Sequence, residues 1–214
     1  MEENFWHQKW EKNEIAFHEE QPNPILVKYI SQLSLKKDSR IFVPLCGKTL
    51  DIAWLLSHDY QVAGAELSPR AIGQLFNDLG VTPTITSLGK LNCYSAININ
   101  IYVGNIFDLT RSMLGVVDAI YDRAAMVALP ENMRPRYSKH LINITNQAQQ
   151  LLITYTYNQA DMEGPPFSVS NGEVKQHYSQ YYGITLLESN AILGGLKGYP
   201  AYENIWHLQG LKGE

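Results

Sequence analysis

Glu66 is the residue from which a chemical role can be argued most directly, because it ends a run of small and apolar residues, QVAGA. An ionised carboxylate in such surroundings is costly unless it has a partner. A carboxylate only accepts hydrogen bonds, which suits the two hydroxyl groups of a ribose. The alternative is structural, since an acid just before Ser68 would stabilise the N-terminus of a helix. We favour the ribose role.

Leu45 and Gly47 lie in a predicted turn, PLCGK, that precedes Glu66 by roughly 20 residues, the spacing between glycine turn and ribose acid in nucleotide-binding folds. The turn lacks the G-x-G-x-x-G pattern of pyrophosphate-binding loops and does not match a P-loop. A single glycine therefore favours a nucleoside cofactor without phosphates, and S-adenosylmethionine (SAM) is such a molecule. A tight turn without any ligand is the plainer alternative.

Arg123 is the third candidate, because it follows a predicted buried strand in the segment Tyr121-Asp122-Arg123. Ligands of such sheets bind beyond the carboxyl ends of the strands, so Arg123 should face the same cleft as Glu66. Its guanidinium could hold a carboxylate or another anionic acceptor by charge-assisted hydrogen bonds. The alternative is a surface ion pair between Asp122 and Arg123, which would add little stability.

Asn105 and Ile106 follow another predicted strand, at the place where an adenine should lie. The Asn105 amide could accept a hydrogen bond from the exocyclic amine. Phe107-Asp108 is equally compatible with a simple turn. Further along, Gly164-Pro165-Pro166-Phe167 is predicted to form a stiff wall of the pocket, or else only a loop whose prolines restrict the unfolded chain.

Trp6, Trp10 and Phe17 form an aromatic group near the start of the sequence. From the residues alone, such a stripe is more typical of core packing, although aromatic faces also attract a sulfonium cation. Cys46 is expected to be a small buried side chain, because no motif places a base beside it. The histidines and the two cysteines lack the spacing of metal ligands, so we expect no metal.

The elements that must position these residues alternate between strands and helices, which indicates an α/β sheet with helices on both faces. Within the helix at 50–57, Leu50, Ala53, Trp54 and Ser57 share a face that we expect to be buried. Residues 81–96 are polar and irregular, and we expect a surface excursion. Strands are predicted at 41–45, 61–67, 97–103, 116–121, 151–157, 184–189 and 203–208, and helices at 2–13, 24–35, 50–57, 69–79, 130–146 and 171–182.

The last two strands have only a short connection, which suggests an antiparallel pair at, or inserted into, the edge of the sheet. We therefore predict a seven-stranded, mostly parallel, doubly wound, Rossmann-like sheet in a single domain, 1–214. The formal charge of −4 and the lack of a basic run argue against nucleic acid or an anionic membrane as partner. No signal-peptide pattern, long apolar run or disulfide framework is evident. We expect a cytoplasmic monomer.

Several motifs in one order, PLCGK, GAELS, GNIFDL, YDRAAMVALP and GPPFSV, together with FWHQKW and AFHEEQPNP at the front, resemble the thiopurine S-methyltransferase family in its bacterial form. The resemblance runs from about Phe5 to Val174. It implies a class I methyltransferase fold, SAM as cofactor, and methyl transfer to the sulfur of thiopurines or of aromatic and heterocyclic thiols. Selenium or tellurium compounds are further implied acceptors.

The resemblance also implies roles for single residues. Trp10 would contact SAM, Phe17 would lie near the acceptor, and Arg123 would contact SAM and border the acceptor. Residues 1–35 would form a helical cover over the cofactor. Bacterial relatives usually carry an acid where this chain has Asn105, and Lys197 is the only cation in the glycine-rich stretch where relatives hold the acceptor.

No general base is evident in the sequence, which agrees with a thiol acceptor of low pKa that is already partly thiolate. Two other functions stay open. A dinucleotide-dependent oxidoreductase would share the acid after the second strand, but this chain lacks the glycines that such an enzyme needs. A catalytically silent SAM-binding module would keep the same cofactor residues.

Overall fold

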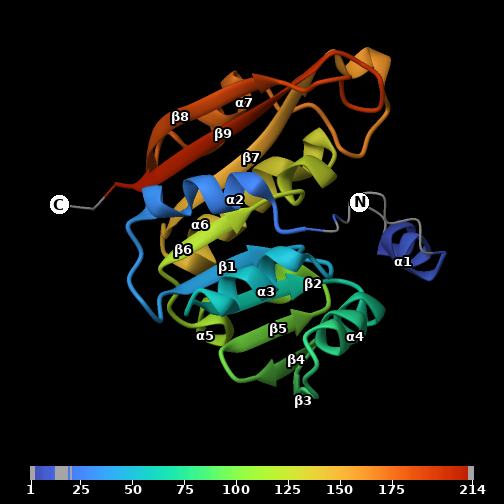
Figure 1. The fold of residues 1–214 in the computed structure, drawn as a ribbon, viewed down its shortest axis with the longest axis vertical. Helices are drawn as coiled ribbons and strands as arrows, with labels where there is room; N and C mark the ends of the chain where they lie inside the picture. Colours follow the sequence, from blue (N-terminus) through green and yellow to red (C-terminus); the bar gives the residue numbers. More distant parts are fainter. Residues whose placement is uncertain (1–2, 13–18, 20, 212–214) are drawn as a thin grey trace.

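The computed structural model describes residues 3–12, 19 and 21–211, and a single mixed sheet runs through them (Figure 1). The strand order is β3-β4-β5-β2-β1-β6-β7-β9-β8. Their bounds are Arg40–Pro44 (β1), Gln61–Glu66 (β2), Thr84–Leu88 (β3), Leu91–Ala96 (β4), Ile99–Val103 (β5), Ala119–Asp122 (β6), Gln149–Tyr157 (β7), Tyr182–Ala191 (β8) and Ala201–Gly210 (β9).

Five neighbouring strands, β5, β2, β1, β6 and β7, are parallel. Their residues are apolar on both faces because helices cover both sides of the sheet. One face packs against α2 (Pro24–Tyr29), α3 (Leu50–Ser57) and α4 (Pro69–Asp78). The other packs against α5 (Arg111–Leu114), α6 (Arg134–Thr145) and α7 (Asn171–Tyr178). The doubly wound fold predicted from the sequence is therefore confirmed.

The strand count is nine, and the prediction of seven was wrong because residues 81–96 are not a surface excursion. They contain β3 and β4, an antiparallel hairpin that extends the sheet beyond β5. In β3 the first four residues are exposed, so this strand shows no alternation of buried and exposed positions. In β4 only Leu91 and Cys93 are buried. The hydrophobic pattern is thus too weak to reveal either strand in the sequence.

The predicted antiparallel pair of final strands is confirmed, and of the two positions considered the structure has the inserted one. β9 lies between β7 and β8 and is antiparallel to both. The Leu208 end of β9 pairs with Gln150, near the start of β7, and Ala201 pairs with Tyr157 at the other end. The seven strands other than the β3–β4 hairpin therefore have the arrangement that was expected.

The buried face of α3 differs from the expected one. Asp51, Ile52 and Leu55 are buried, whereas the predicted face, containing Trp54, is only partly covered. Trp54 stacks on His58 at the protein surface, with ring centroids 3.9 Å apart. The shift has a consequence, because it places a carboxylate, Asp51, inside the molecule.

Several helices are shorter than predicted. The segment from Pro24 is α-helical to Tyr29 and continues as a 3₁₀ turn, Ile30–Leu33. A 3₁₀ turn, Glu131–Met133, likewise precedes α6. The N-terminal helix α1 (Glu3–Glu11) lies beside the carboxyl ends of the parallel strands in Figure 1. None of the helices in the described ranges has the length and apolar character needed to cross a membrane.

Candidate active site

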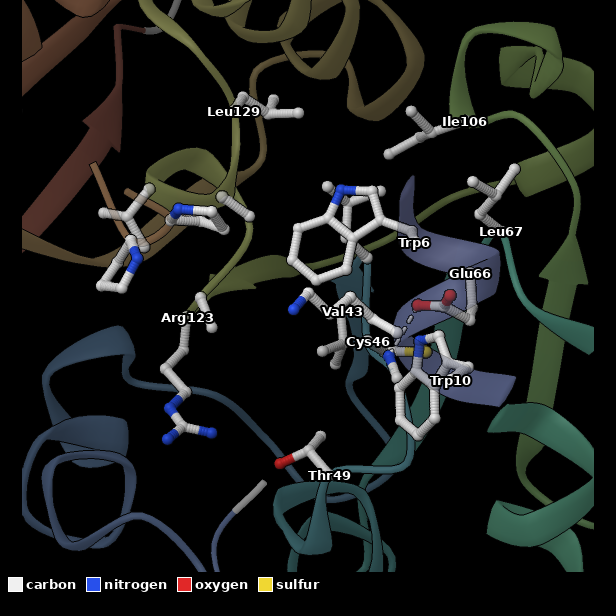
Figure 2. A pocket seen from close by; sticks show the side chains of 18 of the residues that line it. Trp6, Trp10, Val43, Cys46, Thr49, Glu66, Leu67, Ile106, Arg123 and Leu129 are labelled. Atoms are coloured by element: carbon white, nitrogen blue, oxygen red, sulfur yellow. Dashed lines mark hydrogen bonds between the residues drawn. The ribbon is translucent and has the colours of Figure 1, made fainter. Parts of the chain in front are cut away.

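A cavity of about 1420 Å³ opens at the carboxyl ends of the parallel strands (Figure 2). The loops that follow β1, β2, β5, β6 and β7 contribute to its walls, and α1 closes one side. Most of the residues singled out from the sequence line this cavity: Trp10, Leu45, Gly47, Glu66, Asn105, Ile106 and Arg123. Phe17 lies outside the described residues.

Glu66 ends β2 with its side chain only 6% exposed. One carboxylate oxygen, Oε2, accepts a hydrogen bond from the Gly47 backbone N–H at 2.8 Å, and Oε1 accepts one from the Ser68 N–H at 2.8 Å. Burial raises the pKa of this carboxyl, and the backbone donors oppose that rise. A carboxylate offers about four acceptor positions. The acid therefore joins two loops and still has acceptor positions left for hydroxyl groups of a ligand.

Gly47 and Trp10 lie in close contact. Gly47 has a positive φ of +53°, and a Cβ added there would be 3.0 Å from Cζ2 of Trp10. Trp10 itself is 3% exposed. The loop and the indole thus leave no room for a side chain at residue 47, and the bare backbone faces the cavity.

Cys46 is buried beside this loop, as predicted, and burial raises the pKa of its thiol well above the usual value. The thiol therefore stays protonated at neutral pH and is a poor nucleophile. Leu45, which precedes it, adopts a positive φ of 47° and forms part of the cavity wall.

Asn105 begins the loop after β5 and caps a 3₁₀ turn, Ile106–Asp108. Its Oδ1 accepts a hydrogen bond from the Phe107 N–H at 3.0 Å. The turn interpretation of this segment is therefore correct, and the turn also lines the cavity. The sequence did not reveal Arg136, whose guanidinium carbon lies 3.9 Å from the centre of the Phe107 ring at the same end of the cavity.

Asp122 and Arg123 do not form the surface pair that was one alternative. Asp122 is fully buried, and its oxygens accept hydrogen bonds from the Tyr137 hydroxyl at 2.8 Å and from the Met126 N–H at 3.0 Å. Burial raises the pKa of the Asp122 carboxyl to about 6, although both donors oppose the rise. Arg123 turns the other way, into the cavity, and forms an ion pair with Glu19.

Asn23 and Asp51, which were not singled out from the sequence, support this part of the wall together with Tyr121. The Asn23 backbone N–H donates to Oδ1 of the buried Asp51 at 2.7 Å, and the Tyr121 hydroxyl donates to its Oδ2 at 3.1 Å. The Asn23 side chain caps α2 through the Ile25 N–H at 2.9 Å. An Asn before a Pro is a recognisable helix start, so this one signal was available in the sequence.

Gly164, Pro165 and Pro166 line the cavity, in agreement with the predicted wall. Two cations hold this segment in place. The Lys197 ammonium donates to the Pro165 carbonyl at 2.8 Å. The buried Arg134 donates to the Ser168 carbonyl at 3.0 Å. Across the described ranges, no group of histidine, cysteine and acidic side chains could hold a metal ion.

A sequence model of the family described as Thiopurine S-methyltransferase (TPMT) matches residues 1–201. A curated protein from Gluconobacter oxydans (strain 621H), named thiopurine S-methyltransferase, is 50% identical over 208 residues, which cover 97% of this chain and 94% of that protein. A protein of the same name from Teredinibacter turnerae (strain ATCC 39867 / T7901) is 48% identical over 209 residues, which cover 97% of each chain.

Solved structures share the fold. A SAM-dependent methyltransferase from Methanosarcina mazei superposes with a TM-score of 0.63 at 16% identity, covering 90% of this chain and all of that one. The Burkholderia thailandensis 1,6-didemethyltoxoflavin-N1-methyltransferase was solved with 1,6-didemethyltoxoflavin and S-adenosylhomocysteine. It superposes with a TM-score of 0.66 at 10% identity, covering 98% of this chain and 87% of that one. The predicted methyltransferase architecture is confirmed by these similarities.

Proposed function

This chain belongs to the thiopurine S-methyltransferase family, and on that premise we propose that it transfers the methyl group of SAM to the sulfur of a small acceptor. The acceptors proposed are thiopurines and aromatic or heterocyclic thiols, with selenium or tellurium compounds as further candidates. When bound, SAM supplies a methyl group on a sulfonium sulfur, which leaves as the thioether of S-adenosylhomocysteine once the acceptor sulfur has bonded to the methyl carbon.

The residues around the cavity fit this cofactor. Glu66 has acceptor positions for the ribose hydroxyls beside the two backbone N–H groups that it already binds. Gly47 exposes backbone in a place where a Cβ would meet Trp10. In this proposal Leu45, Asn105 and Ile106 surround the nucleoside, and the Trp10 face lies toward the cationic sulfur.

The protein's part in the reaction is to hold the acceptor and to exclude water. Walls from α1, from Val127–Leu129 and from Gly164–Pro166 enclose the cavity. A shaped cavity of this kind favours reaction by positioning, and exclusion of water by the bound ligands would add to that effect. Arg123 is the cation proposed to hold an acidic acceptor. No proton has to be abstracted from an acceptor that arrives as a thiolate, so the buried Cys46 and Asp122 need no catalytic role.

The observation that supports this function best is the Glu66 carboxylate, which is buried at the carboxyl end of β2, beside β1, and accepts a hydrogen bond from the N–H of a lone glycine. The test is incubation of the protein with methyl-labelled SAM and thiophenol or a thiopurine, with the label followed into the thioether. Binding of S-adenosylhomocysteine without any transfer would identify a silent binding module. Binding of a nicotinamide dinucleotide instead would overturn the proposal.

We also propose that residues 1–35 cover the cofactor, because Phe5, Trp6 and Trp10 of α1 line the cavity. Deletion of residues 1–12 should weaken binding of S-adenosylhomocysteine and lower turnover, while far-UV circular dichroism still reports a folded sheet. Equal affinity in the truncated protein would refute the cover. We further propose that the protein is a cytoplasmic monomer with no nucleic-acid partner. Size-exclusion chromatography with light scattering tests the oligomeric state.

A further inference from the structure

Arg123 already has an acidic partner inside the cavity. One of its terminal nitrogens, Nη2, pairs with Oε1 of Glu19, and the Arg123 side chain is only 10% exposed. The second oxygen of Glu19 accepts a hydrogen bond from the Asn23 side-chain amide at 3.3 Å. Asn23 is buried and its backbone N–H donates to Asp51, so its amide contacts Glu19 from a fixed position.

The two partners differ in their exposure to water. The Glu19 side chain is 44% exposed, whereas Arg123 is almost enclosed. Glu19 can therefore leave the pair and be hydrated at small cost, because a half-exposed carboxylate gains little from an ion pair. Arg123 cannot follow it into water and needs another acceptor once Glu19 has gone. The Arg123 Nε–H, moreover, is buried without a hydrogen-bond partner among the described residues.

The charges around Arg123 decide whether an acidic ligand adds to the pair or replaces Glu19. Burial alone would lower the pKa of Arg123, but Glu19, Tyr121 and Asp51 raise it. Asp51 is fixed by Asn23 and stays in place. Glu203 also interacts with Arg123 and with Glu19. A carboxylate entering beside Glu19 would thus make four acids for one guanidinium. Carboxylates gathered around one guanidinium repel one another, so replacement of Glu19 by the ligand is favoured over addition of the ligand beside it.

From this geometry we propose that Glu19 stands in for an acidic group of the acceptor, so that thiols bearing a carboxylate or another oxyanion bind Arg123 by displacing Glu19. This inference rests on the proposed function and deepens it. Glu19 is then a specificity-determining residue. It lowers the affinity for acidic acceptors by competition, and it has no such effect on neutral thiols.

The first test compares two acceptors that differ in one charge, 3-mercaptobenzoate and its methyl ester. In Glu19→Gln the ratio of kcat/KM for the acid to that for the ester should rise about fivefold or more, the scale of a modest ion pair. Glu11→Gln is the matched control, since it removes the same charge from an exposed position in α1. An unchanged ratio in Glu19→Gln, or an equal rise in both variants, would overturn the proposal.

A second test needs no methyl transfer and so separates this inference from the proposed function. Benzoate, titrated calorimetrically without cofactor, should bind Glu19→Gln more tightly than the wild type, and benzamide should not distinguish the two proteins. In the wild type, benzoate should also speed cleavage after Glu19 by a glutamate-specific protease, because Arg123 no longer holds that side chain. The exchange is refuted if benzoate does not speed the cleavage and does not bind Glu19→Gln more tightly than the wild type. That outcome is decisive whether or not thiols are methylated.

Discussion

The Gly47 backbone N–H donates a hydrogen bond to the Glu66 carboxylate at 2.8 Å, across 19 positions of the sequence. This contact joins the loop after β1 to the end of β2. A residue proposed to bind ribose is therefore also a part of the frame that shapes the cavity. Changes at Glu66 should alter both ligand affinity and stability.

Glu66→Ala should weaken binding of S-adenosylhomocysteine by about 1–3 kcal/mol, because the ribose hydroxyls lose their acceptor. The unfolding free energy should fall as well, since the N–H groups of Gly47 and Ser68 lose their acceptor. Glu66→Gln keeps one acceptor oxygen and should show smaller losses of both. Calorimetry and urea denaturation measure the two effects. Unchanged affinity in the alanine variant would refute the ribose role.

Gly47→Ala should destabilise the protein by about 1–2 kcal/mol, because a side chain at positive φ is strained and would press on Trp10. Affinity for S-adenosylhomocysteine should fall with it. Gly73→Ala is the control: a Cβ there meets no atom within 4 Å, and Gly73 lies in α4, so stability should rise by up to about 1 kcal/mol. An unaltered melting temperature in Gly47→Ala would contradict this prediction, because it would mean that the loop accommodates the added side chain without strain.

Arg123→Ala should lower turnover by about tenfold or more, the usual scale for a lost charge-assisted hydrogen bond. Its fold should survive, because the partner Glu19 is half-exposed and can be hydrated. Arg70→Ala, at an exposed position, is the control and should leave turnover unchanged. A large drop in the melting temperature of Arg123→Ala would favour a structural role instead.

Asp122 should make stability depend on pH. Burial raises the pKa of its carboxyl from 3.8 to about 6, so the folded protein holds this proton more tightly than the unfolded chain does. Its contribution is therefore fully present below pH 3.8 and is lost as pH rises through about 6. At about 1.4 kcal/mol per pKa unit, the loss is about 3 kcal/mol at most. The pKa values of Glu66 and Glu203 are also raised, first by burial, and act in the same direction.

Asp122→Asn removes this titration and keeps the shape of the side chain. The unfolding free energy, measured by urea denaturation at several pH values, should fall less steeply between pH 4 and about 7 than in the wild type. Asp38→Asn, which makes the same substitution at an exposed position, is the matched control. Identical slopes in Asp122→Asn and the wild type would show that the pKa of Asp122 does not differ between the folded and unfolded states.

The parts of the site that sequence could predict depend on local signals. Ser68 and Pro69 mark the start of α4, which places Glu66 at the end of the preceding strand. Gly47 is visible as a lone glycine after an apolar strand. Arg123 follows a predicted buried strand, whereas the role of Trp10 came from the family resemblance. The structure places both residues in the cavity wall. Such signals are local, so they suffice to place each residue at the end of an element.

Contacts between distant residues were not predictable in this way. The Tyr121 hydroxyl reaches Asp51 across 70 positions, and no pattern in either segment announces the partner. Glu19 lies in a stretch where several acids alternate with other residues, so nothing singles it out as the partner of Arg123. The β3–β4 hairpin was missed for a related reason. Only Leu91 and Cys93 of the hairpin are buried, and no local pattern reveals that β4 pairs with β5.

The insertion of β9 between β7 and β8 has a consequence for synthesis on the ribosome, which releases the chain from its N-terminus. When residues 182–191 leave the exit tunnel, the strand that must join them to the sheet has not yet emerged. The nascent protein therefore keeps an open edge on β7 until Ala201–Gly210 has emerged. That interval is the time at which a chaperone or another nascent chain has access to the edge.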